Sequence, residues 1–75
     1  MFIEYDKETD GAYVWLGEDI SEFRDRYAGE IWPSELKDEI GLLFDDHGKL
    51  LGLEIMPASK YLSDRLLADA KRTGE

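Results

Sequence analysis

The chain has 75 residues with 18 acidic and 9 basic side chains, a formal charge of −9, no cysteine and a single histidine. This composition excludes disulfide bonds, thiolate metal sites, thiol nucleophiles and a histidine-rich metal site. Because an acidic surface repels nucleic-acid phosphates and anionic lipid head groups, we expect the chain to bind neither nucleic acids nor membranes.

The first half of the chain predicts a β-hairpin followed by a less regular segment. Residues 2–6 alternate between apolar and polar side chains, and residues 12–16 follow as a second strand after a polar turn. A third strand is predicted over 26–32 and ends at Pro33, because proline cannot donate a ladder hydrogen bond. Residues 20–25 fit either a loop or a short helix.

The second half predicts another hairpin and then a helix. Strands over 40–44 and 50–56 flank residues 45–49, a turn rich in Asp and Gly. The apolar period then changes from 2 to about 3.6, with Ser59 as N-cap, which predicts an amphipathic helix over 58–72. We expect an α+β fold: a small antiparallel β-sheet of four to five strands, made of two hairpins, with one C-terminal helix packed on one face. Whether the helix packs on its own sheet or on a neighbouring chain stays open.

The predicted strands are apolar in both phases. The phase that we expect beneath the helix contains Ile3, Tyr5, Ala12, Val14, Leu16, Ile40, Leu42, Phe44, Leu51, Leu53 and Ile55. The opposite phase should be polar if it faces water, yet it contains Phe2, Tyr13, Trp15, Leu43, Leu50 and Met56. One short helix cannot cover two faces, so the second face is a predicted interaction surface unless residues 17–37 fold over it. Its predicted interface residues are Tyr13, Trp15, Trp32, Leu43 and Leu50; a role as core aromatics is the alternative for the rings.

Two acidic segments imitate functional sites but fit turns better. Residues 6–11 match the first half of a calcium loop, but Gly17 stands where the bidentate Glu should be. Asp45, Asp46 and His47 lie in a tight turn, where side chains point to solvent. His47 is the sole imidazole, and no serine lies in a Gly-x-Ser-x-Gly elbow. We therefore predict no catalytic residue, no cofactor and no metal ion.

The chain resembles the family known as domain of unknown function 2283, small bacterial and archaeal proteins. The similarity is carried by four motifs, IEYD at 3–6, DGAYVWL at 10–16, FDDHGKLLGLEI at 44–55 and ASKYL at 58–62. The stretch between Leu16 and Ile40 is longer than the family's usual third strand, and Pro57 stands where a polar helix cap is common. The resemblance implies a small antiparallel sheet with a C-terminal helix, and it implies no activity. Some relatives are thought to be encoded beside small toxins, which implies an antitoxin-like role.

The size of the chain favours association. We expect one domain over 1–75, and a domain of this length buries only about 60% of the surface that its unfolded chain exposes. Disulfides, metals or association usually add stability at this size, and of these we expect association. No stretch approaches the ~18 apolar residues of a membrane span, and Met1 leads directly into a strand pattern rather than a signal peptide. We therefore expect a cytoplasmic protein.

Two functions follow from these observations. The first is a protein-interaction module that forms a homodimer through the Tyr13/Trp15 face, or uses that face and its acidic rim to hold a basic protein partner such as a toxin. The alternative is a small ligand-binding or enzymatic domain with a carboxylate/aromatic site at a subunit boundary, motivated by the abundance of acids and aromatics.

Overall fold

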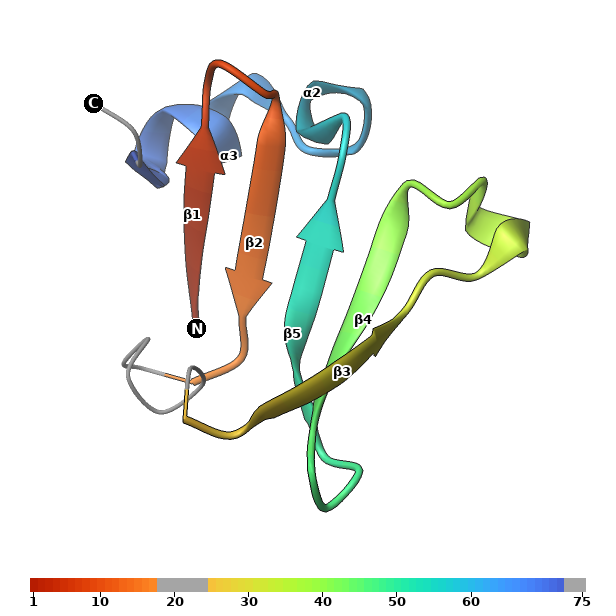
Figure 1. Cartoon of the computed structure of the whole chain (residues 1–75). Coiled ribbons are helices and arrows are strands. Elements are labelled where there is room, and N and C mark those ends of the chain that lie inside the picture. The colour runs from red at the N-terminus through yellow and green to blue at the C-terminus, as the bar shows by residue number, and fades with distance from the viewer. Residues whose placement is uncertain (18–24, 73–75) are drawn as a thin grey trace.

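The structure is a computed structural model that describes residues 1–17 and 25–72, the last two through their backbone alone. Strands β1 to β5 pair antiparallel, and the two-residue β6 pairs parallel with β1, in the sheet order β3-β4-β5-β2-β1-β6. The predicted α+β class with two hairpins is confirmed. The elements in Figure 1 are β1 (Phe2–Asp6), β2 (Gly11–Trp15), β3 (Tyr27–Ile31), η1 (Ser34–Leu36), β4 (Ile40–Asp45), β5 (Leu50–Ile55), α2 (Ala58–Tyr61), α3 (Asp64–Asp69) and β6 (Lys71–Arg72).

The C-terminal segment differs from the single helix predicted over 58–72. It forms α2 and α3, because Leu62 and Ser63 adopt extended backbone between them. The Ser63 hydroxyl accepts a hydrogen bond from the backbone N–H of Leu66 at 3.2 Å and so caps a new helix. The predicted cap, Ser59, lies inside α2 instead. Within the described residues, no helix is long and apolar enough to cross a membrane.

Asp10 connects the β1–β2 turn to the start of α2. Its backbone oxygen accepts a hydrogen bond from Ala58 N at 2.7 Å, and its carboxylate accepts from the backbone N–H and the hydroxyl of Ser59. Tyr5 donates its hydroxyl to the same carboxylate at 2.9 Å. Asp10 has a positive φ of 54°, in a left-handed region that Asp tolerates better than most residues. A turn residue therefore supplies acceptors for the first N–H groups of α2, which lack partners inside a helix.

Glu39 holds the other end of α2. Its Oε1 accepts hydrogen bonds from Lys60 Nζ at 2.8 Å and from the Tyr61 hydroxyl at 2.6 Å. Its backbone oxygen accepts a hydrogen bond from Met56 N at 2.9 Å. The Lys60 and Tyr61 hydrogen bonds lower the pKa of Glu39. The short helix is thus fixed from both sides by carboxylates that precede it in the chain.

The two faces of the sheet differ in what covers them. We call the side on which α2 and α3 pack the helix face; its buried centre consists of Ala12, Ile55, Ala58 and Leu67. A row of paired apolar residues crosses five strands on this face: Ile31, Leu42, Leu53, Val14 and Ile3. The members from β5, β2 and β1 pack against the buried centre. Figure 1 shows α2 and α3 at this end of the sheet, away from β3.

The opposite side, which we call the acidic face, carries the strand carboxylates and a second apolar cluster. Trp15, Leu43 and Leu51 are buried in this cluster, with Phe2 packed against them. Two glycines leave room for the rings: Trp15 lies against Gly52, and a side-chain carbon at Gly41 would come within 2.6 Å of Trp32. No helix is needed to bury these residues, because the rings lie on the backbone of a strongly twisted sheet (Figure 1).

A β-bulge exchanges the predicted faces of Leu50 and Leu51. Phe44 pairs with Leu50, whereas Leu43 pairs with Gly52, so Leu51 is the extra residue. Since alternation is interrupted at an extra residue, Leu51 joins the cluster on the acidic face, and Leu50 lies on the helix face opposite Phe44. Uninterrupted strand alternation predicts each of them on the other side, and this prediction is wrong.

Replacing Gly52 with alanine tests the packing of Trp15. An alanine Cβ would overlap the backbone oxygen of Val14 and lie 3.2 Å from the Trp15 ring. We expect Gly52→Ala to lower the free energy of unfolding by about 1–3 kcal/mol in urea titrations, because a paired strand cannot move aside. Gly29→Ala is the control, since a Cβ there meets nothing within 4 Å and should leave stability equal or slightly raised. Equal losses in both variants would contradict this packing.

The Asp10 contacts should make the protein lose stability in acid. Hydrogen bonds from Ser59, and then from Tyr5, lower the pKa of Asp10 below its ordinary value of 3.8. A carboxylate with a lower pKa in the folded state stabilises the fold above its unfolded pKa, and this contribution is lost as the pH falls through the folded value. Asp10→Asn should therefore lower stability at neutral pH and flatten its decline between about pH 5 and pH 2.

Urea titrations at a series of pH values check this expectation. Glu8→Gln, which changes an exposed acid of the same turn, should reproduce the wild-type pH profile. A profile for Asp10→Asn that runs parallel to the wild-type profile would show that Asp10 does not carry the acid dependence.

Candidate interaction surfaces

Charge is separated between the two faces of the sheet. Strands β1 to β5 contain no lysine or arginine. Their carboxylates share one phase by pairing register, and those directed to the acidic face are Glu4, Asp6, Glu30 and Glu54. The strand positions of the helix face carry apolar side chains or glycine. Strands β1 to β5 therefore have one acidic side and one side without charge, while β6 adds the basic residues Lys71 and Arg72 at the β1 edge.

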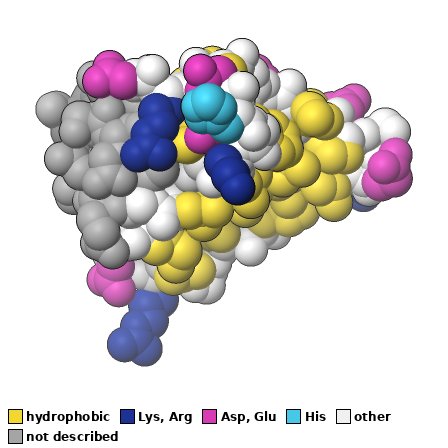
Figure 2. Space-filling view, turned by 90° about the horizontal axis from the view of Figure 1, so that it is seen from below, with side chains coloured by type: hydrophobic (Ala, Val, Ile, Leu, Met, Phe, Trp, Pro, Cys, Tyr) yellow, Lys and Arg dark blue, Asp and Glu magenta, His cyan; other side chains and the backbone are white. Residues whose placement is uncertain are grey.

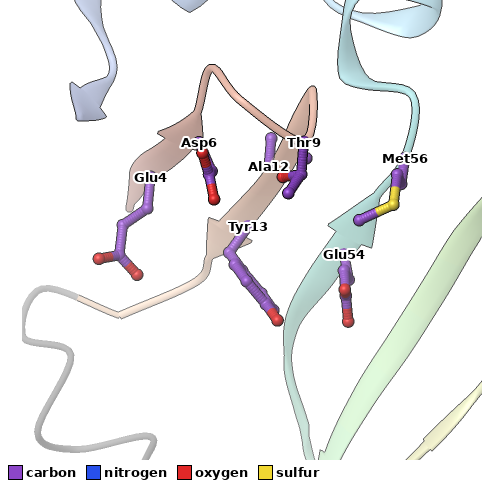
Figure 3. A pocket seen from close by; sticks show the side chains of 8 residues that line it. Glu4, Asp6, Thr9, Ala12, Tyr13, Glu54 and Met56 are labelled. Carbon is purple, nitrogen blue, oxygen red and sulfur yellow. The ribbon is translucent and has the colours of Figure 1, made fainter. Parts of the chain in front are cut away.

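The centre of the acidic face is a tyrosine between two carboxylates. Glu4, Tyr13 and Glu54 are paired in register on β1, β2 and β5, with neighbouring strands about 4.8 Å apart. Figure 3 shows the Tyr13 ring between the two carboxylates. Trp15 stacks on Tyr13 with ring centroids 5.4 Å apart, and its Nε1–H donates to Glu4 Oε1 at 2.7 Å. The aromatic pair is thereby held in a fixed position beside Glu4.

The acids on this face are crowded together. Burial raises the pKa of Glu54, and the negative charge of Glu30 raises it further. Burial also raises the pKa of the Tyr13 hydroxyl, followed by the charge of Glu54 and a hydrogen bond to it. Tyr27 donates its hydroxyl to Glu30 at 3.0 Å. Both shifts favour the protonated forms, with burial as the first cause and neighbouring negative charge as the second.

A small hollow opens beside this row. Its volume is about 170 Å³, and it is lined by Glu4, Asp6, Thr9, Gly11, Ala12, Tyr13, Glu54 and Met56. Pockets that hold small-molecule ligands usually measure about 300–1,000 Å³, so this one suits the end of a single side chain better than a substrate. Within residues 1–17 and 25–72, no group of His, Asp or Glu is placed to hold a metal ion.

An apolar strip on the helix face is left uncovered by the elements that residues 1–17 and 25–72 form. It consists of Ile31, Leu42, Phe44 and Leu50, which lie on β3, β4 and the start of β5. Ile31 is 57% exposed and Leu50 is 44% exposed, while Leu42 and Phe44 are partly buried. Figure 2, which views the molecule from below, shows hydrophobic side chains as a continuous band. We call these four residues the uncovered strip.

The structure divides the five predicted interface residues between the two faces. Tyr13, Trp15, Trp32 and Leu43 lie on the acidic face and Leu50 on the helix face. Leu43 is 1% and Trp15 8% exposed, so both are packing residues of the single chain, while Tyr13 is 38% exposed. Association through these residues stays a prediction. Part of the alternative cover, 17–37, falls on 18–24, which lie outside the described residues.

The turn that contains the single histidine is structural. Asp45 is buried, and its Oδ1 accepts hydrogen bonds from the backbone N–H groups of His47 and Lys49 at 2.9 and 2.8 Å. These bonds lower the pKa of Asp45, the bond from Lys49 most. Asp46 and His47 are exposed. The predicted turn chemistry is therefore present, although Asp45 points into the turn rather than into solvent.

Sequence reasoning did not single out Glu4, Glu54, Ile31 or Phe44. The signal for the acids was available, because each follows the strand alternation in the phase of Tyr13. The uncovered strip could not be found in this way. Ile31 and Phe44 lie on the helix face, which a helix of the predicted length would have covered.

Comparisons with known proteins identify a family and no activity. A family model described as "Protein of unknown function (DUF2283)" matches residues 3–59. No curated protein and no solved structure matches the chain.

Removing the charge of Glu54 should change the titration of Tyr13. We expect Glu54→Gln to lower the pKa of Tyr13 towards its ordinary value of 10.0, and burial, the larger cause, to keep it above that value. The measurement is the ring carbon shift of labelled tyrosine against pH. The pKa of Tyr61 is raised by its hydrogen bond to Glu39 and should not move. If the pKa of Tyr13 is unchanged in Glu54→Gln, the charge of Glu54 does not act on the Tyr13 hydroxyl, and this prediction is wrong.

Proposed function

The chain belongs to the DUF2283 family, which has no assigned activity, and we propose that it is a protein-interaction module that forms a homodimer through the uncovered strip. The observation that carries the proposal is the exposure of Ile31 and Leu50 beside partly buried Leu42 and Phe44. Contiguous exposed apolar side chains of this kind mark interaction sites in small soluble proteins.

Charge favours a second copy as the partner for this strip. Two molecules of net charge −9 repel one another when their acidic surfaces meet. The strip consists of apolar side chains on a face without strand charge, so two copies can approach there without apposing carboxylates. In a two-fold arrangement the same patch contributes from both copies, which places Ile31 and Leu50 against apolar partners.

Association would also add buried apolar surface to a single chain whose own core is small. The helices bury one end of the helix face, around Ala12 and Ile55, and leave the β3–β4 end of the same residue row open. A domain of about this size gains little from its own core, and oligomerisation is one of the usual additions. A dimer would extend burial along this row from Leu53 through Leu42 to Ile31 on the edge strand.

The alternative from the sequence, a ligand-binding or enzymatic domain, has weaker support. Its carboxylate/aromatic residues do converge at the hollow beside Tyr13 and Glu54. The volume of that hollow is below the range of ligand pockets. An antitoxin-like role requires a basic protein partner, and the surface suited to such a partner is the acidic face.

Light scattering after size exclusion, over a wide range of concentration, tests the homodimer. We expect the wild type to be a dimer and the neutral substitutions Ile31→Gln and Leu50→Gln to shift it towards monomer, because each buries a polar amide in an apolar contact. Leu66→Gln is the matched control, since Leu66 is 46% exposed but lies on α3. A monomeric wild type, or equal dissociation of the control, would overturn the proposal.

A further inference from the structure

We infer that the acidic face is a docking surface for a basic protein segment, with an arginine or lysine side chain seated between Glu4, Tyr13 and Glu54. This surface lies on the opposite side of the sheet from the uncovered strip. The inference therefore goes beyond the proposed homodimer and does not depend on it.

The aromatic ring gives the site its first element of recognition. Tyr13 is 38% exposed, so one part of its ring remains open to a partner, while the stacked Trp15 behind it is buried. A cation held within about 6 Å of an aromatic centroid is attracted by the ring, and guanidinium groups also stack on it. The stacking fixes the ring orientation before a partner arrives.

The carboxylates give the second element, and their register gives the spacing. Glu4 and Glu54 are on the strands that flank β2, so they stand on opposite sides of the Tyr13 ring. With strands about 4.8 Å apart, the two backbones are separated by roughly 10 Å, a span in which one guanidinium or ammonium group can reach both carboxylates. Figure 3 shows the side chains of this row on one side of the sheet.

The charge of the surroundings selects a basic partner. Glu30 lies near enough to Glu54 to raise the pKa of that carboxyl, and strands β1 to β5 supply no lysine or arginine beside this pair. The basic residues of β6 pair with β1 at the far edge, three or more strands away from Glu30 and Glu54. A cation from a partner would relieve the crowding of these like charges. The same carboxylates repel phosphates, so a basic protein segment fits this surface and a nucleic acid does not.

The shape favours a side chain of a protein over a small free ligand. The hollow of about 170 Å³ is bordered by Thr9 and Met56 as well as by the acids, and so accepts one side-chain terminus. The face continues past Glu54 to Trp32 and Glu30 on the β3 side of the sheet. A segment in extended conformation, which turns alternate side chains to one surface, can use both the hollow and this continuation.

The test uses a blocked peptide that alternates arginine with threonine, and the same peptide with citrulline in place of arginine. Binding to the full chain is followed by amide shifts in NMR titrations at low salt and at physiological salt. We expect Glu54→Gln to weaken binding of the arginine peptide by about fivefold. Glu35→Gln, which removes one charge from η1, should weaken it much less.

The result expected is a saturable set of shifts centred on Glu4, Tyr13 and Glu54, absent with the citrulline peptide. Tyr13→Leu should weaken binding, because it removes the aromatic ring but leaves an apolar side chain in its place. Thermal melts establish that each variant is folded. Equal effects of Glu54→Gln and Glu35→Gln, or shifts spread over all acidic residues, would overturn the inference. If the arginine peptide still binds to Leu50→Gln, the acidic face acts independently of the homodimer interface.

Discussion

The position of α2 at one end of the sheet is the constraint from which the surfaces of this protein follow. Asp10 holds the first turn of the helix against the β1–β2 turn, and Glu39 holds its last turn beside the start of β4. With α2 fixed there, α3 lies behind the β1–β2 end of the sheet and the chain continues into β6, which pairs with β1. The helices therefore reach Leu53 and leave the β3 end of the same row uncovered.

The two faces bury their apolar residues in different ways. On the helix face, side chains from separate elements pack against one another, so burial ends where the helices end. On the acidic face, tryptophan rings lie on the backbone at Gly41 and Gly52, and burial needs no second layer. That arrangement leaves the rim free for carboxylates. One thin sheet thus combines an apolar side and an acidic side without a larger fold.

The α+β class and the two hairpins could be predicted because the strands have a clear period of two, and Pro33 marks the end of a predicted strand. Three features could not be predicted, for separate physical reasons. The bulge at Leu51 leaves the composition of β5 unchanged and alters only its alternation. Ser63 is compatible with a helix interior as well as with a cap, so the break depends on competition within the tertiary structure. The acidic–aromatic row depends on pairing across β1, β2 and β5.

The bulge has a consequence for the length of β5 in this chain. A strand with one extra residue tolerates the loss of that residue better than the loss of any other, because pairing on both sides of Leu51 would then become regular. A single-codon deletion at Leu51 would remove a buried leucine from the acidic face but keep Leu50 opposite Phe44. A deletion of Gly52 or Leu53 that left the bulge in place would instead shift Glu54 by one position and turn its carboxylate towards the helices.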